Sequence, residues 1–289
     1  MKEEIFMHIP VYGLEHTFLE KDTELLYRHS SLKETAPLHT HTFYEFFVVT
    51  EGSALHMVNN AVQTLSKGDL LFIRAQDTHC YDFYHSDNFY IQNIGFSNQL
   101  LQRIRLFLGH SQNLQALLES DLPPCFHLTT LELQEVSSAF KKIGDMLKTA
   151  PPQSTTSHAQ CYLALLFTDY FFDYPHTSPF KSELSPWFEA MLTQMQKLEN
   201  LQEGFSKMLA LSPCSKNHLC RLFKSKLNVT PTQYINNNRL NYSIYLLIHT
   251  DWDILEISET CGFNNLSHFY HLFKAKYACS PALFRKSSK

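Results

Sequence analysis

The sequence is short of glycine and has no long apolar run. It contains 8 Gly and 12 Pro in 289 residues, which argues against a low-complexity or linker-like chain. No stretch of about 18 apolar residues occurs, so no membrane span is expected. The opening residues MKEEIFMHIP are acidic and lack an apolar core, and we therefore expect no signal peptide.

The sequence also lacks the signs of disulfide bonding. The 7 cysteines are odd in number and none of them forms a CxxC pair, so a disulfide framework is not indicated. We expect reduced thiols that pack mostly as small apolar side chains, as is usual in a cytoplasmic protein.

Charge is distributed unevenly along the chain. Residues 1–185 hold 12 Lys and Arg against 21 Asp and Glu, whereas residues 186–289 hold 12 against 7. The net charge of −4 therefore combines an acidic front part with a basic C-terminal third. This asymmetry predicts a nucleic-acid contact that is confined to the C-terminal third.

The first hundred residues have the pattern of an antiparallel β domain. Short apolar runs between about residues 24 and 97 alternate with turn residues, and Asn59-Asn60 joins two strand-like runs as a hairpin turn would. No helical period interrupts them. We therefore expect a sandwich or barrel over residues 1–98.

Helical patterns follow. Residues 130–149 carry an apolar stripe with helical spacing, and residues 157–174 form a second, strongly apolar helix after Pro151-Pro152. Two alternatives stay open for this pair, a core within the domain and a dimer interface. We assign residues 99–174 to a helical dimerisation segment and the Pro- and Ser-rich residues 175–186 to a linker.

The C-terminal part contains an internal repeat. HLCRLFKSKLNVTPTQYI begins at His218 and HFYHLFKAKYACSPALFR begins at His268, an offset of 50 residues without a gap. Six of the first fourteen positions are identical, including LFK and a Pro. Chance rarely produces such an alignment, so the repeat indicates two copies of one structural unit.

Each copy predicts a helix-turn-helix. A short helix, at about residues 201–210 or 254–260, is followed by a turn and a longer helix that begins near Ser215 or Asn265, both good N-cap residues. A helix from Thr230-Pro231 onward joins the units. Two recognition helices held roughly 34 Å apart can enter successive major grooves of one duplex.

Residues 186–289 resemble the AraC/XylS family of bacterial transcription regulators, through HLCRLFK, Arg239 followed by SIYLL, ILEIS with CGF, and HFYHLFKAKYACSPALFR. The resemblance implies a DNA-binding domain at residues 187–289 with two helix-turn-helix motifs. Arg221 is the foremost candidate, since Arg can contact guanine with two hydrogen bonds. The DNA-binding positions that the resemblance and the exposed helix faces suggest are Lys216, Asn217, Cys220, Arg221 and Lys224 in the first unit, and Leu266, Ser267, Tyr270, His271 and Lys274 in the second.

The N-terminal segment HTHTFYEFFVVTEG, followed by GDLLFIRAQDTH, resembles the cupin pattern. The first motif is complete, whereas Arg74 and Gln76 replace the usual Pro and Gly of the second. Alternation along a strand places residues 39, 41 and 45 on one face. The candidate effector-binding residues are His39, His41, Glu45, His79, Tyr44 and Tyr81, and the first four of these are also the candidate metal ligands.

Three interpretations of this cluster stay open. It can be a metal-free effector pocket, a site for a divalent transition metal such as Zn, Fe, Ni or Mn, or the centre of a metal-dependent cupin enzyme fused to a DNA-binding domain. The family resemblance favours the metal-free pocket, because sensor domains of this family often keep the His and Glu without a metal, and imidazoles and carboxylates bind sugar hydroxyls well. The enzyme is disfavoured, because no nucleophile, phosphate loop or cofactor motif accompanies the cluster. No cofactor is then required.

The overall arrangement is similar to carbohydrate-responsive members of the family, in particular to the chitobiose-operon type of regulator. That resemblance implies a sugar or sugar derivative as effector, double-stranded promoter DNA and RNA polymerase as partners, and a cytoplasmic homodimer. We therefore expect a multi-domain, ligand-responsive transcription regulator and no enzyme.

Overall fold

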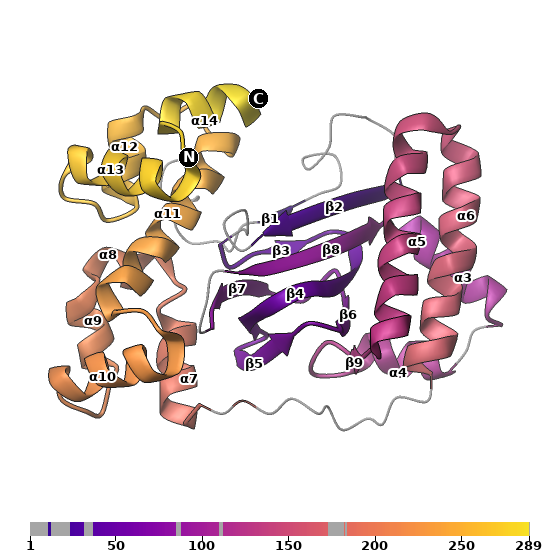
Figure 1. The fold of residues 1–289 in the computed structure, drawn as a ribbon, viewed down its shortest axis with the longest axis horizontal. Helices are drawn as coiled ribbons and strands as arrows, with labels where there is room; N and C mark the ends of the chain where they lie inside the picture. The colour runs from indigo at the N-terminus through magenta and orange to yellow at the C-terminus, as the bar shows by residue number, and fades with distance from the viewer. Residues whose placement is uncertain are drawn as a thin grey trace.

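The computed structural model describes residues 11–12, 24–31, 37–84, 88–109, 112–172, 182 and 184–288. Strands occupy the centre of the molecule (Figure 1). Helices α3 to α6 cover one side of them, and helices α7 to α14 lie on the opposite side. The predicted multi-domain architecture, an antiparallel β domain followed by helices, is confirmed.

One long strand, β4, organises the β domain. Its N-terminal half pairs with β6 and β8, and its C-terminal half pairs with β5 and β7, all antiparallel. The two halves therefore belong to two walls that enclose an apolar interior. The strands are β1 (Val11–Tyr12), β2 (Leu25–Ser31), β3 (Thr40–His41), β4 (Tyr44–Val58), β5 (Ala61–Ser66), β6 (Asp69–Ile73), β7 (His79–Phe83), β8 (Phe89–Phe96) and β9 (Cys125–His127).

Gly52 allows β4 to pass from one wall to the other. The pairing with β8 shifts register between Val49 and Glu51, and Gly52 follows with φ of 76°. A Cβ at this position would meet the carbonyl oxygen of Asn88 at 1.6 Å. The final glycine of the first cupin-like motif is thus required both by its backbone angle and by close backbone approach.

The predicted hairpin at Asn59-Asn60 is present between β4 and β5. Both asparagines have positive φ, 49° and 65°, as a two-residue type I′ turn demands. The turn fixes the register, so that Val58 pairs with Ala61 and His56 pairs with Gln63.

Strand β9 lies inside residues 99–174, for which the sequence predicts only helices. It pairs with β6 and adds an outer strand to the sheet. The sequence did not indicate it, because three residues are too few to reveal an alternating pattern.

The helical layer packs on the outer face of the sheet. Leu133, Val136, Phe140 and Ile143 of α5 are buried against it, which confirms most of the predicted stripe, but Leu131 is exposed. Thr129 and Glu132 form a capping box at the start of α5. The helices are α3 (Asn98–Phe107), α4 (Gln112–Glu119), α5 (Thr130–Thr149) and α6 (Pro152–Leu166), followed by a π-helical turn (Phe167–Phe171).

The C-terminal domain contains both predicted helix-turn-helix units. Ser215 and Asn265 cap the two longer helices, each accepting a hydrogen bond from the backbone N–H three residues on. The short helix predicted at residues 201–210 is divided in two by Gly204, which has φ of 68°. The helices are α7 (Pro186–Gln194), α8 (Leu198–Glu203), α9 (Phe205–Ala210), α10 (Lys216–Leu227), α11 (Pro231–His249), α12 (Ile254–Thr260), α13 (Leu266–Tyr277) and α14 (Pro281–Ser288).

Helix α11 holds the two units together. Its Thr230 cap is formed as predicted. Its Arg239 donates hydrogen bonds to the carbonyl oxygen of Leu201 at 2.7 and 2.9 Å, and its guanidinium lies 5.7 Å from the ring centre of Phe263. One side chain therefore contacts α8 on one side and the turn of the second unit on the other.

The C-terminal domain packs directly on the β domain. Leu55, Met57 and Val62 share one apolar cluster with Phe188 and Met191 of α7. Within this contact, the buried carboxylate of Asp82 accepts hydrogen bonds from Gln196 at 3.3 Å and from Asn238 of α11 at 2.9 Å. Most of the predicted linker lies outside the described residues; α7 begins at Pro186, within one residue of the domain start that we propose.

Candidate functional site

The motif residues of the β domain converge from three strands. His41 belongs to β3, Glu45 to β4 and His79 to β7. His39 lies beside them, because its backbone exchanges two hydrogen bonds with the backbone of His79, at 2.8 and 3.0 Å. Residues far apart in sequence are thus brought to one place by strand pairing.

Three of the four predicted metal ligands form a compact donor cluster. Donor atoms of His41, Glu45 and His79 all lie within 4.8 Å of one another, and His41 Nε2 is 3.8 Å from Glu45 Oε2. His39 does not belong to this trio. Its ring is 4.5 Å from that of His79, and its Nδ1–H donates to the carbonyl oxygen of Pro37 at 2.8 Å.

Two nitrogens of the cluster lack a hydrogen-bond partner among the described groups. They are Nε2 of His41 and Nε2 of His79, and both residues are buried. A buried polar atom without a partner costs about 1–3 kcal/mol, so native proteins nearly always satisfy such atoms. The two orphaned nitrogens therefore mark the place where a ligand would bind.

Burial keeps the histidines of the site uncharged near neutral pH. Desolvation lowers the pKa of His39 and of His56 to about 3 and that of His41 to about 4, and it also lowers the pKa of His79 well below its ordinary value. Desolvation also raises the pKa of Glu45 to about 7, against a hydrogen bond from Asn93. Neutral imidazoles can bind a metal ion or accept a hydroxyl hydrogen bond.

The two candidate tyrosines lie on different sides of the wall. Tyr81 is buried in the interior, its ring stacks 5.1 Å from that of His56, and its hydroxyl has no partner among the described groups. Tyr44 points to the helical layer instead and stacks on Phe72 and Phe96. The prediction that Tyr44 lines the effector site is therefore wrong. Neighbouring residues of a strand face opposite sides, and Glu45 is the one that faces the site.

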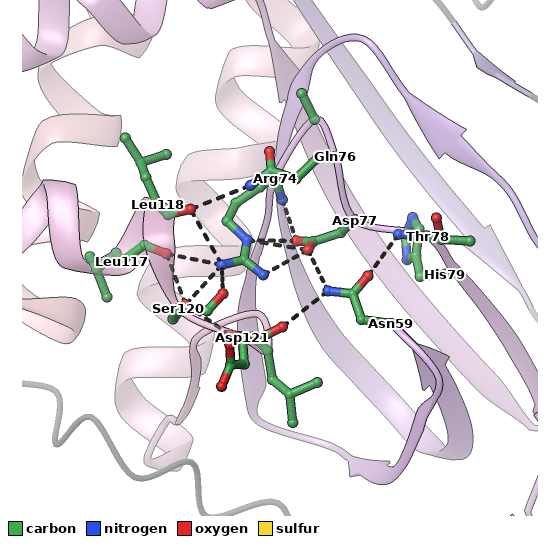
Figure 2. Close-up of polar contacts among 12 residues, drawn as sticks. Asn59, Arg74, Gln76, Asp77, Thr78, His79, Leu117, Leu118, Ser120 and Asp121 are labelled. Atoms are coloured by element: carbon green, nitrogen blue, oxygen red, sulfur yellow. Dashed lines mark hydrogen bonds and ion pairs between the residues drawn. The ribbon is translucent and has the colours of Figure 1, made fainter. Parts of the chain in front are cut away.

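Arg74, one of the two residues that depart from the second cupin-like motif, has a structural role (Figure 2). Arg74 is buried and its guanidinium binds the carboxylate of Asp77 at 2.7 and 2.9 Å. The same guanidinium donates to the carbonyl oxygens of Leu117 and Ser120 at the end of α4. Arg74 thus connects the turn before β7 to the helical layer.

Asn59 continues this network toward the site. Its amide donates to Asp77 at 2.7 Å and accepts from the backbone N–H of Thr78 at 3.0 Å. Thr78 directly precedes His79, as Figure 2 shows. The hairpin turn, the buried ion pair and α4 together fix the position from which His79 enters the site.

Two buried residues of the site were not identified from the sequence, namely His56 and Gln63. His56 Nε2 lies 3.1 Å from His79 Nδ1, and Gln63 Nε2 lies 2.5 Å from His56 Nδ1. The Asn59-Asn60 hairpin contained the signal, because a two-residue turn pairs residue 56 with residue 63.

The predicted DNA-binding residues lie on the outer faces of α10 and α13. Asn217, Arg221, Ser267 and His271 are exposed. Lys216 lies 5.6 Å from the ring centre of Phe205. Of the remaining candidates, Lys224 and Lys274 are exposed, and Cys220, Leu266 and Tyr270 are half-buried.

Lys224 has a structural partner of its own. Its ammonium donates to the carbonyl oxygen of Asn228 at 3.1 Å, at the C-terminal end of α10. Leu266 and Tyr270 pack against the core of the second unit. Asn217, Arg221, Ser267 and His271 therefore remain the more accessible candidates for base contacts.

Comparison with known proteins agrees with both halves of this description. The family description "AraC-like ligand binding domain" matches residues 20–143, and "Helix-turn-helix domain" matches residues 208–287. The transcriptional activator RhaS of Klebsiella pneumoniae is 26% identical over 254 residues, covering 86% of this chain and 87% of that protein. The transcriptional activator RhaR of an Enterobacter species is 23% identical over 251 residues, covering 87% of each.

Among solved structures, one of ToxT from Vibrio cholerae matches with a TM-score of 0.44 and 16% identity, covering 93% of this chain and all of that one. Within the described residues, no helix combines the length and apolarity needed to span a bilayer.

The protein is a transcription regulator with an N-terminal ligand-binding domain and a C-terminal DNA-binding domain. With both domain types in one chain and relatives that match most of its length, it belongs to the AraC family. This confirms the resemblance that the repeat and the cupin-like motifs had indicated.

Proposed function

We propose that the chain regulates transcription in response to a sugar or sugar derivative bound in the interior of the β domain. The observation that carries this proposal is the pair of buried, unpartnered nitrogens of His41 and His79 beside Glu45. Neutral imidazoles, a carboxyl group and the Tyr81 hydroxyl offer several donors and acceptors within the apolar interior of the β domain, as binding of a polar small molecule requires. The resemblance to carbohydrate-responsive regulators, including the chitobiose-operon type, supports the choice of a carbohydrate.

A divalent transition metal is the second candidate ligand. His41, Glu45 and His79 would hold it, a set of nitrogen and oxygen donors that suits zinc and its neighbours. A bound ion would supply a Lewis acid at the site. We propose that the chain is a regulator and not a cupin enzyme fused to a DNA-binding domain, since its curated relatives are transcriptional activators.

DNA is the partner of the two recognition helices, and Arg221 is the residue that we expect to contribute most. Arg221→Ala should weaken binding to the protein's own promoter DNA by about 5- to 150-fold, since one good base contact is worth about 1–3 kcal/mol. Fluorescence anisotropy at fixed salt measures this. Arg105→Ala on α3 is the control, because it removes the same charge outside the DNA-binding domain. Unchanged affinity of the Arg221 variant would contradict the assignment.

We propose further that two chains dimerise through residues 130–173 and act in the cytoplasm on the promoter together with RNA polymerase. Leu131 and Leu165 support this, because each presents a largely exposed apolar side chain, 65% and 53% accessible, on α5 and α6. Two linked DNA-binding domains gain affinity through effective concentration.

The dimer can be tested in the full-length chain. The double variant Leu131→Glu, Leu165→Glu should be monomeric at micromolar concentration, because charge in an apolar interface is strongly unfavourable. Sedimentation velocity gives the mass. Leu255→Glu, at a similarly exposed leucine on α12, should leave the dimer intact. A dimer that persists in the double variant would disprove this interface.

A further inference from the structure

Three buried side chains form a continuous chain that ends in the effector site. Gln63 of β5 contacts His56 of β4, and His56 contacts His79 of β7, with nitrogen to nitrogen distances of 2.5 and 3.1 Å. All three are at most 3% exposed. Gln63 is therefore connected to the ligand-facing nitrogen of His79 although it lies outside the donor cluster.

Hydrogen bonds along such a chain must all run in one direction. A neutral imidazole carries one N–H and one lone pair, and burial keeps these rings neutral. Gln63 presents its amide nitrogen to His56 Nδ1, so Nδ1 accepts and His56 carries its hydrogen on Nε2. His56 Nε2 then donates to His79 Nδ1. His79 consequently holds its hydrogen on Nε2, the atom that faces the site.

His41 has the opposite tautomer. Its Nδ1 lies 2.6 Å from the carbonyl oxygen of Phe43, and a carbonyl oxygen only accepts, so Nδ1 carries the hydrogen. The Nε2 of His41 is therefore a lone pair. The two orphaned nitrogens are a donor, on His79, and an acceptor, on His41. A hydroxyl group complements such a pair, because it can accept one hydrogen bond and donate another.

We propose that Gln63 is a specificity-determining residue, which makes His79 a hydrogen-bond donor and so selects a hydroxyl-bearing ligand over a divalent metal ion. This role of Gln63 rests on the proposed effector site, and it determines which class of ligand that site binds. A metal ion needs lone pairs on both His41 and His79. Gln63 leaves His79 Nε2 without a lone pair. Its amide nitrogen can only donate to His56, and His56 then donates to His79 Nδ1.

Gln63→Glu tests this by reversing the chain. At pH 8 an ionised carboxylate can only accept, so His56 would donate to it through Nδ1 and accept from His79 through Nε2. His79 Nε2 then becomes a lone pair next to those of His41 and Glu45. Carboxylate groups behind a metal-binding histidine change metal affinity about 10- to 100-fold. We therefore expect the variant to bind Co²⁺ at least tenfold more tightly than the unmodified protein, measured by visible absorption and calorimetry.

Gln92→Glu is the matched control. Gln92 is similarly buried on β8 and accepts a hydrogen bond from Ser137 of the helical layer, so this change adds a charge without touching the histidine chain. It should leave Co²⁺ affinity unchanged. Equal Co²⁺ binding by the unmodified protein and Gln63→Glu, or an equal gain in Gln92→Glu, would overturn the proposal.

A second measurement needs no folded variant at position 63. Long-range ¹H–¹⁵N spectra of the unmodified protein distinguish the two neutral histidine tautomers, with His79→Gln serving to assign the signals. We expect the Nε2–H form for His79 and the Nδ1–H form for His41. An Nδ1–H form at His79 would disprove the direction of the chain. Neither readout depends on DNA or transcription, so failure here and failure of the regulatory function are separable.

Discussion

Arg74→Ala is expected to lower the free energy of unfolding by about 3–5 kcal/mol, because removing one partner of a buried ion pair leaves the other charge without compensation. Asp77 is fully buried and would lose the guanidinium that neutralises it. The carbonyl oxygens at the end of α4 would lose their donor as well. Urea unfolding followed by far-UV circular dichroism measures the effect.

Arg103→Ala is the control for this experiment. Arg103 also pairs with a carboxylate, that of Glu24, but both side chains are about a third or more exposed. An exposed pair contributes about 0–1 kcal/mol, so the control should change stability little. If the two variants lost the same small amount, the buried network would not stabilise the β domain as described.

Acidification is expected to unfold the β domain between pH 6.5 and about 4. The pKa values of His39, His41 and His56 are about 3, 4 and 3 in the folded protein, and that of His79 is lowered too. Unfolded histidines titrate near 6.5. Below that pH the unfolded chain binds more protons, so stability is present above pH 6.5 and is lost as pH falls.

Glu45 opposes this trend, because its pKa is raised to about 7 and the folded state holds its proton longer. Near pH 5 four histidines outweigh one carboxyl by about three protons, which corresponds to about 4 kcal/mol per pH unit. Urea midpoints from pH 4 to 8 provide the measurement. His56→Gln should reduce the slope by about one proton. A stability that does not change between pH 4.5 and 6.5 would contradict the neutral, desolvated site.

The DNA-binding domain could be predicted from sequence in detail, because its signals are local. Ser215, Asn265 and Thr230 cap helices through residues three positions away. Gly204 was the exception. Its positive φ divides α8 from α9, and the helical pattern on either side concealed the break. The outward faces of α10 and α13 follow from the same local periodicity.

The effector site was predictable only in part. The motif spacing identifies His41 and Glu45, and the second motif identifies His79. Strand alternation also places Tyr44 on the opposite face from Glu45, which excludes Tyr44 from the site. The role of Arg74 could not be foreseen, since it depends on α4 some forty residues away in sequence. Long-range contacts of that kind leave no periodic signal.

Strand β7 contacts both the effector site and the helices of the C-terminal domain directly. His79 and Tyr81 face the interior, whereas Cys80 packs in the cluster that includes α7 and Asp82 binds Asn238 of α11. A ligand that shifts β7 therefore also shifts the contacts of α11, the helix that joins the two helix-turn-helix units. Thermodynamic linkage makes the coupling reciprocal. Whatever factor the effector applies to operator affinity, the operator must apply to effector affinity, so promoter occupancy itself adjusts the sensitivity of the sensor.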